Sequence, residues 1–380
     1  MLWASSRSGL RSLSAGLPPS NAKMSLGPPL GVLAGEIAQA GTERVAAALD
    51  RELLRRAELF LAGLEAYRSH PFRRAPNDGR VVWQEGTTRL LEYGGAGRPV
   101  LLVPSLINRH YILDLLPECS FVRFLRERGL RPLVVDWDAP GKAERGFGLD
   151  DYIAGRLQRA FAAAVALAGA PVAVIGYCMG GLLALALAQL RMAEISALAL
   201  LVTPWDFHAE RPEQARLLGT LIDAAATDDG LPLWMIQSLF LSLDPFLAER
   251  KFIRFAGLDS DSEAARDFVA LEDWLNDGVP LVGRVARECG GDWYRDNSPA
   301  RGSWCVDGDV VAPEKFHRPA LVVVPGRDRI VPPRSAEALG AALPHATVLR
   351  PPLGHIGMMA SAAAPRTVWE PIADWLLAAG

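Results

Sequence analysis

Apolar side chains occur in short continuous runs along much of the chain, and segments with helical spacing of apolar residues lie between these runs. Runs without polar alternation are typical of parallel strands that are covered on both faces. The predicted strands cover residues 100–103, 132–135, 172–175, 197–202, 320–324 and 347–349, and the predicted helices cover residues 149–168, 181–192, 333–343 and 366–378. This alternation predicts an α/β fold with a mostly parallel central sheet and helices on both faces.

Other segments lie outside this repeating pattern. Apolar residues spaced by three and four predict a long helix between Thr42 and Tyr67, and two strand-like pieces predict an entry hairpin over residues 81–93. The stretch between the strands at 197–202 and 320–324 is rich in Trp and Phe and is too long and too apolar for a loop. It predicts an inserted cap or lid. The predicted division is a tail over 1–28, a helical segment over 29–80, the core over 81–204 and 318–380, and the cap over 205–317.

The first 28 residues carry Arg7, Arg11 and Lys23, and the first acidic residue is Glu36. This is the composition of an organelle transit peptide, while the apolar core of a secretory signal is missing. Met24 is an alternative start of the protein. Two interpretations therefore stay open, a targeting sequence and a disordered or upstream extension, and neither contributes to the predicted fold.

Composition excludes several classes of protein. The chain has 380 residues, of which 50% are hydrophobic and 22% charged, so it can bury a sizeable core and is not a disordered chain. Its 40 basic and 43 acidic side chains leave a net charge of -3, which predicts no nucleic-acid partner. Polar residues interrupt the most apolar stretch, 182–202, which predicts no transmembrane span. The four cysteines form no C-x-x-C pair, which favours a reducing compartment such as the cytoplasm.

The candidate nucleophile is Cys178. The predicted strand at 172–175 runs into Gly-Tyr-Cys-Met-Gly-Gly at 176–181 and then into a helix, which is the order of a nucleophile elbow, G-x-S-x-G, with cysteine in place of serine. Such a turn holds the nucleophile at positive φ and leaves no room for side chains two residues away, hence Gly176 and Gly180. The following helix N-terminus favours a thiolate, and the Met179 amide is the natural oxyanion donor. The alternative interpretation is that Cys178 is a small buried apolar side chain.

An elbow of this kind needs an acid and a histidine later in the chain, each after a C-terminal strand. Asp328 follows the strand at 320–324, and His355 lies in a glycine-flanked loop after the last strand. Asp328 has two alternative roles, which are to cap the helix that begins near Pro333 or to pair with a neighbouring arginine. Five other histidines lack such a position and are interpreted as surface or packing residues: His70, His110, His208, His317 and His345.

A second oxyanion amide normally comes from the loop after an early strand, here residues 104–109. Ile107 is the candidate for this amide. A plain connection between a strand and a helix explains the loop almost as well, so both interpretations stay open.

Several of these segments resemble the polyhydroxyalkanoate synthases, cysteine-dependent members of the α/β-hydrolase superfamily. The elbow at 176–181 resembles their G-Y-C-x-G-G box, and Leu-Ile-Asn-Arg-His-Tyr-Ile-Leu-Asp-Leu at 106–115 resembles their I-N-x-x-Y-I-L-D-L segment. Further similarity lies at residues 135–137, 150–152, 203–207, 294–297 and 354–357. The resemblance covers about residues 80 to 378 and is to the catalytic subunits of the short-chain-length type. The chain length resembles that of the shorter family members, some of which work with a second, non-catalytic subunit.

The resemblance implies an α/β-hydrolase fold and polymerisation of (R)-3-hydroxyacyl groups from CoA thioesters, with release of CoA. It implies Cys178 as the acyl carrier, His355 as its base and Asp328 as the third member, with no metal and no cofactor besides the CoA substrate. The expected partners are the (R)-3-hydroxyacyl-CoA, the growing polyester, a second non-catalytic synthase subunit and further copies of the chain. The expected location is the cytoplasm or the surface of polyester granules.

One position departs from the family pattern. Many members have histidine after the triad aspartate, whereas this chain has Arg329. An extra cation there is expected to keep Asp328 ionised and to compete with His355 for it.

Two other functions use the same fold. A thioesterase or a polyester depolymerase would need the same Cys-His-Asp triad and would differ only in the access of water. A non-catalytic granule-binding protein would need the fold alone. A cysteine nucleophile favours acyl transfer, because exchange of one thioester for another keeps the acyl group activated for a hydroxyl acceptor.

Overall fold

The computed structural model describes residues 9–10, 28–75 and 79–379, and it divides into two compact units. The first unit contains the described chain up to Pro71 together with Pro245–Arg266, and the second contains Phe72–Asp244 and the chain from Asp267 onward. The predicted tail over residues 1–28 lies almost wholly outside the described residues.

The second unit is built on one sheet of eight described strands. In spatial order these are β1 (Arg80–Glu85), β2 (Thr88–Glu92), β6 (Leu130–Asp136), β3 (Arg98–Val103), β7 (Val172–Tyr177), β8 (Ile195–Leu201), β11 (Ala320–Val323) and β12 (Ala346–Leu349). The strands β1 and β2 form an antiparallel hairpin, β2 pairs antiparallel with β6, and all remaining pairs are parallel. The predicted entry hairpin and mostly parallel sheet are confirmed.

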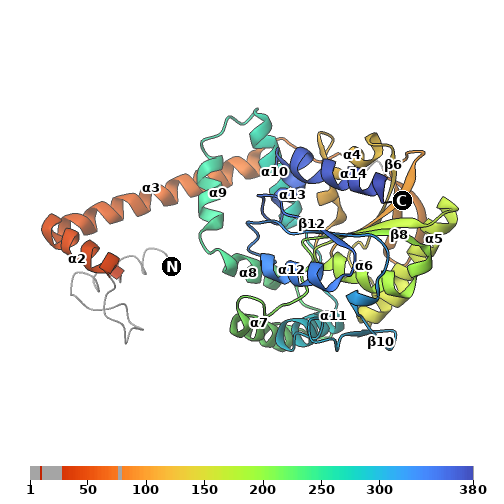
Figure 1. Cartoon of the computed structure of the whole chain (residues 1–380). Helices are drawn as coiled ribbons and strands as arrows, with labels where there is room; N and C mark the ends of the chain where they lie inside the picture. Colours follow the sequence, from red (N-terminus) through yellow and green to blue (C-terminus); the bar gives the residue numbers. More distant parts are fainter. Residues whose placement is uncertain (1–8, 11–27, 76–78, 380) are drawn as a thin grey trace. The chain divides into compact units, whose positions relative to one another are not determined.

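Helices cover both faces of this sheet (Figure 1). One face carries α5 (Gln158–Ala168), α6 (Met179–Leu190) and α12 (Pro333–Ala342), and the other carries α4 (Phe121–Glu127) and α14 (Glu370–Ala378). Along β3, Leu101 and Val103 pack on the first face while Val100 and Leu102 pack on the second, all with 0% exposure. Burial on both faces therefore explains the continuous apolar runs in the sequence.

Two of the predicted helices begin with a π-helical turn. The π-helix at Asp151–Leu157 leads into α5, and the π-helix at Pro365–Trp369 leads into α14. The remaining short elements of this part of the chain are a 3-10 helix at His110–Leu113, β4 (Asp114–Leu116), β5 (Cys119–Ser120), a 3-10 helix at Met192–Glu194 and α13 (Gly357–Ala360).

The long segment between β8 and β11 is mostly helical. Within the second unit it contains α7 (Pro212–Ala225), α8 (Leu233–Leu243), most of α10 (Glu263–Asn276), α11 (Gly283–Glu288), a π-helix at Cys289–Arg295, the hairpin of β9 (Cys305–Val306) and β10 (Asp309–Val310), and a 3-10 helix at Pro313–Lys315. Its aromatic side chains pack on one another: the ring centroids of Phe207 and Tyr294 are 4.8 Å apart, and those of Trp293 and Trp304 are 5.4 Å apart. This packing explains the aromatic composition of the segment.

The first unit consists of α2 (Pro28–Ala40), α3 (Thr42–Ser69), α9 (Leu247–Phe255) and the start of α10. Helix α3 confirms the predicted long helix. It packs on α9 through Phe60 and Tyr67, whose ring centroids lie 5.9 and 5.8 Å from that of Phe252. Gly63 lies against the Phe252 carbonyl group, where a β-carbon would overlap it, so the close approach of the two helices requires glycine.

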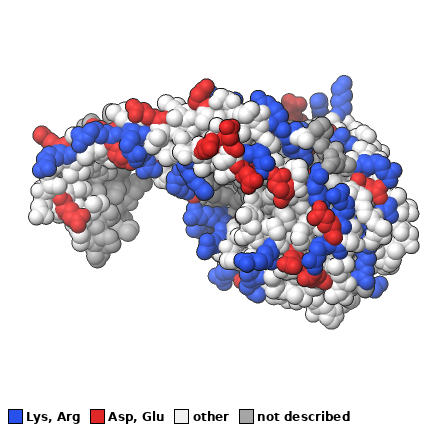
Figure 2. Space-filling model, turned by 90° about the horizontal axis from the view of Figure 1, so that it is seen from above, with Lys and Arg blue, Asp and Glu red and all other residues white. Residues whose placement is uncertain are grey.

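The surface carries both signs of charge. Lys and Arg side chains alternate with Asp and Glu side chains on the face shown in Figure 2, in line with the small net charge of -3. None of the helices in the described part of the chain is long and apolar enough to cross a membrane.

Candidate active site

Cys178 lies at the sharp turn between β7 and α6. Its φ is 56° and its ψ is -126°, so the predicted positive-φ conformation is confirmed. A β-carbon at Gly180 would overlap the Val103 carbonyl oxygen, and one at Gly176 would overlap the α-carbon of Gly181. The two glycines are therefore required because backbone from β3 and α6 passes directly beside the turn.

His355 and Asp328 form a buried pair beside this turn. The His355 Nδ1 atom lies 2.7 Å from Asp328 Oδ2, and the two residues are only 9% and 7% exposed. The other carboxylate oxygen of Asp328 accepts hydrogen bonds from the amides of Ile330 (2.7 Å) and Val331 (3.0 Å). The carboxylate thus has a partner on each oxygen, and its orientation toward the imidazole is determined by the turn that follows β11.

The imidazole of His355 also interacts electrostatically with Cys178. Burial alone would lower the pKa of His355, but the negative charge of Cys178 and the bond with Asp328 outweigh burial and raise this pKa from 6.5 to about 10. His355 therefore holds a proton at neutral pH, between a sulfur and a carboxylate. The structure brings together all three residues that the sequence predicts as the catalytic group, although they lie in three distant segments of the chain.

Two tyrosines interact electrostatically with Cys178, and neither is predicted as a site residue from the sequence. The Tyr177 hydroxyl donates to the His355 carbonyl oxygen at 3.2 Å. Burial and the negative charges of Cys178 and Asp328 raise the pKa of Tyr177, while burial and the charges of Cys178 and Cys289 raise the pKa of Tyr294. Both phenols therefore remain neutral donors. The only sequence signal for them was their place in the family-like segments 176–181 and 294–297.

The two predicted oxyanion donors differ in their surroundings. Met179 is the first residue of α6, so its amide has no carbonyl partner one turn earlier in that helix. The amide of Ile107 donates to Ser105 Oγ at 3.2 Å, and its carbonyl oxygen accepts from the Val279 amide at 3.1 Å. These two bonds hold the loop of residues 104–109, called the Ile107 loop below, in place. The Ile107 amide can donate to an oxyanion only after its bond to Ser105 Oγ is broken. Both assignments stay predictions.

Arg329 does not compete for the triad acid, so this expectation is wrong. Its guanidinium pairs with Asp244 at the end of α8, with Nη1 and Oδ2 2.6 Å apart, and its side chain is 73% exposed. The oxygens of Asp328 already have His355 and two amides as partners. The cation therefore connects the loop after β11 to the inserted segment instead.

Two of the other histidines take part in packing. His110 Nδ1 lies 3.0 Å from Asp136 Oδ1, and the His208 Nε2 atom lies 2.9 Å from the Tyr294 carbonyl oxygen. Within residues 28–75 and 79–379, no group of three or more His, Cys, Asp or Glu side chains is arranged to hold a metal ion.

The order of the strands places these parts at one position on the sheet. The chain runs from β3 outward to β6 and then returns to the other side of β3 as β7. Ligands of open α/β sheets bind outside the carboxyl ends of the strands at such a reversal. The Ile107 loop follows β3 and Cys178 follows β7, so the predicted nucleophile and oxyanion loop occupy this switch point.

Comparisons with known proteins agree with this fold. Residues 98–362 match the alpha/beta hydrolase fold family, and the chain belongs to that class. The solved structure of BpoC from Mycobacterium tuberculosis H37Rv superposes with a TM-score of 0.54 at 18% identity, over 80% of this chain and 100% of that chain, which supports the fold alone.

Similarity to curated proteins identifies the family to which the chain belongs within this class. Poly(3-hydroxyalkanoate) polymerase subunit PhaC of Allochromatium vinosum is 31% identical over 284 residues, which is 73% of this chain and 80% of the relative. The protein of the same name from Haloferax mediterranei is 29% identical over 321 residues, which is 80% of this chain but only 64% of that longer relative. The chain belongs to the family of these poly(3-hydroxyalkanoate) polymerases.

Proposed function

We propose that the protein is an acyltransferase that polymerises (R)-3-hydroxyacyl groups from CoA thioesters through an acyl thioester on Cys178. The observation that carries this proposal is the positive-φ Cys178 at a nucleophile elbow together with the hydrogen-bonded pair of His355 and Asp328, whose imidazole interacts electrostatically with Cys178. The polyester product is supported by the names of the relatives from Allochromatium vinosum and Haloferax mediterranei, which are poly(3-hydroxyalkanoate) polymerase subunits.

Acylation begins with attack of the Cys178 sulfur on the carbonyl carbon of the substrate thioester. The negative charge that develops on the carbonyl oxygen is stabilised by the Met179 amide and the Ile107 amide. When the intermediate collapses, the bond to the CoA sulfur breaks, and the CoA thiolate takes the proton that His355 holds. The acyl group now forms a new thioester with Cys178, and neutral His355 is ready to act as a base.

Chain extension reverses the direction of proton transfer. The 3-hydroxyl group of a second hydroxyacyl chain attacks the Cys178 thioester, its proton passes to His355, and an ester forms as the sulfur leaves. Asp328 holds the imidazole in the required orientation throughout both steps. Because acyl groups pass between sulfur and oxygen without a change of oxidation state, we propose that no cofactor and no metal are needed.

Analysis of the products with purified protein and (R)-3-hydroxybutyryl-CoA tests this function. We expect release of CoA and formation of polyester, with both lost in Cys178→Ala and retained in Cys305→Ala, which removes an exposed cysteine on β9. Release of CoA with only free 3-hydroxybutyrate would favour a thioesterase. The absence of any CoA release that depends on Cys178 would overturn the enzymatic proposal.

We further propose that the protein works with additional copies of itself or with a second, non-catalytic synthase subunit, in the cytoplasm or at polyester granules. The word "subunit" in the names of the relatives supports such an assembly. Light scattering of the purified protein measures its oligomeric state, and fractionation of cells that contain polyester measures its association with granules. A monomer that reaches full activity alone, absent from granules, would contradict the proposal.

A further inference from the structure

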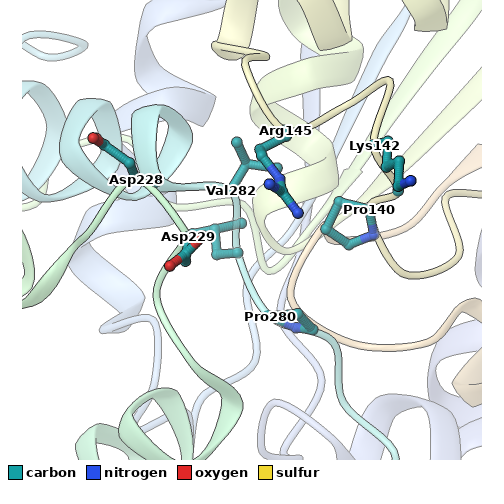
Figure 3. Close-up of a pocket in the computed structure, with 10 residues that line it drawn as sticks. Pro140, Lys142, Arg145, Asp228, Asp229, Pro280 and Val282 are labelled. Carbon is teal, nitrogen blue, oxygen red and sulfur yellow. The ribbon is translucent and has the colours of Figure 1, made fainter.

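A surface cavity of about 310 Å³ lies outside the triad (Figure 3). Its walls come from the 140–145 loop after β6, from Asp228 and Asp229 between α7 and α8, and from residues 280–283 at the start of α11. In the close-up, the Arg145 side chain extends toward the space between these walls, whereas the carboxylates of Asp228 and Asp229 are turned away from it (Figure 3). A cation is therefore the charged group best placed to meet a ligand there.

The cavity adjoins the proposed oxyanion loop. The Val279 amide donates to the Ile107 carbonyl oxygen at 3.1 Å, and the next residue, Pro280, lines the cavity. Consecutive α-carbons are about 3.8 Å apart, so the cavity wall begins one residue from that contact. On the other side, the indole of Trp137 donates to the Pro104 carbonyl oxygen at 3.0 Å, just before the 140–145 loop. Two of the three walls of the cavity are thus connected to the loop beside Cys178.

The order of the strands in the sheet also places the cavity near Cys178. The 140–145 loop follows β6, the Ile107 loop follows β3 and Cys178 follows β7, and these three strands are parallel neighbours. Since neighbouring strands lie about 4.8 Å apart, the end of β6, from which the 140–145 loop continues, lies about 10 Å from the end of β7 along the same sheet edge.

A buried carboxylate holds the 140–145 loop in shape. Glu144 is 0% exposed and accepts hydrogen bonds from the amides of Gly141 (3.0 Å) and Thr87 (3.1 Å) and from Arg156 Nη1 (2.9 Å). Lys142 and Arg145, two and one residues away, are exposed, and in the described part of the chain neither pairs with a carboxylate. The loop therefore presents two unpaired cations on a preorganised backbone.

We propose that this cavity is the subsite for the phosphate groups of the CoA thioester, with Arg145 as the main contact and Lys142 as a second one. The inference rests on the proposed function. The phosphates lie at the far end of CoA from the thioester, joined to it by the pantetheine arm, so a substrate whose carbonyl meets Cys178 must extend its phosphates away from the sulfur. A guanidinium fork matches the geometry of phosphate oxygens.

The acids at the cavity rim restrict how tightly CoA binds. Asp228 is paired with Arg287 at 3.0 Å, whereas Asp229 is exposed and would repel a phosphate. Modest affinity suits a subsite that must release CoA after every acylation. Neutralising Asp229 should therefore strengthen the interaction, while removing Arg145 should weaken it.

The experiment compares two substrates, 3-hydroxybutyryl-CoA and the 3-hydroxybutyryl thioester of N-acetylcysteamine, which lacks the phosphates. The readout is the ratio of their kcat/KM values in the wild type, Arg145→Ala, Arg145→Lys, Asp229→Asn and the control Arg366→Ala, an exposed arginine in the π-helix before α14. We expect Arg145→Ala to lower the ratio roughly fivefold, Arg145→Lys to lower it less, and Asp229→Asn to raise it. These differences should shrink as ionic strength rises.

Two results would overturn the inference while leaving the proposed function intact. One is a wild type active on both substrates with a ratio that Arg145→Ala does not change. The other is a loss of the same size on both substrates, which would mean that Arg145 only supports the loop. Conversely, a wild type that acylates Cys178 with neither thioester would refute the proposed function itself.

Discussion

The pKa of His355 measures how strongly Cys178 and Asp328 stabilise the protonated imidazole. The difference between an ordinary pKa of 6.5 and about 10 corresponds to about 5 kcal/mol in favour of the imidazolium. Among the groups that raise this pKa, the charge of Cys178 contributes most, while burial opposes it. Cys178→Ala removes that charge but leaves burial and Asp328 in place. We therefore expect the pKa of His355 to fall well below 10 in this variant.

Nuclear magnetic resonance of protein labelled with nitrogen-15 at histidine measures this change. His355 is identified by the signal lost in His355→Gln, and its imidazole shifts are followed from pH 5 to 11. Cys305→Ala is the matched control, because it removes an exposed thiol and leaves the triad unchanged. If His355 still titrates near pH 10 in Cys178→Ala, the sulfur does not stabilise the imidazolium, and the proposed role of His355 as the proton donor to CoA loses this support.

Three further substitutions test other contacts of the site and its support. Gly180→Ala places a β-carbon into a carbonyl group of β3. We therefore expect a loss of about 2 kcal/mol in the free energy of unfolding and slower alkylation of Cys178 by iodoacetamide. Unchanged values of both would mean that the turn relaxes to accommodate the β-carbon. Arg329→Ala removes an ion pair whose guanidinium is 73% exposed, so unfolding by urea should change by less than about 1 kcal/mol, and a larger loss would show a structural role for this connection. Asp136 is buried, which would raise its pKa, but His110 and Arg89 outweigh burial and lower it. The ionised Asp136 carboxylate therefore stabilises the fold above its ordinary pKa of 3.8, and this stabilisation is lost as pH falls through the lower pKa of the folded protein. Asp136→Asn should cost about 3 kcal/mol in the free energy of unfolding by urea at pH 7 and less below pH 3.8. A difference between variant and wild type that does not change with pH would contradict this.

The sheet and the elbow were predictable from the sequence because local rules determine them. Strands buried on both faces must be apolar at every position, as at Val100 and Leu101, so their runs stand out. The elbow requires positive φ at Cys178 and space beside it, which restricts Gly176 and Gly180 to glycine within five residues. Local constraints of this kind produce short sequence patterns from which the strands and the elbow can be predicted.

Contacts between distant segments were not predictable in the same way. Arg329 lies next to Asp328 in the chain, yet it pairs with Asp244, 85 residues away, because the turn after β11 already supplies the partners of the triad acid. Likewise, the Ile107 amide bonds to Ser105 Oγ, which depends on a side-chain rotamer rather than on the pattern of the loop. Neither contact follows from the order of residues along the chain alone.

The order of the strands explains how substrate and base reach the sulfur from different sides. From Cys178, the Ile107 loop and then the 140–145 loop lie in the direction of β3 and β6. The strands β8, β11 and β12 lie in the other direction. Asp328 follows β11 and His355 follows β12, so the imidazole approaches from the side opposite Arg145. With the phosphates of CoA held on the β6 side, as proposed, the thioester carbonyl lies between the two groups. The leaving sulfur then departs next to the proton of His355, and the hydroxyl group that accepts the acyl chain must approach the same imidazole to pass on its proton.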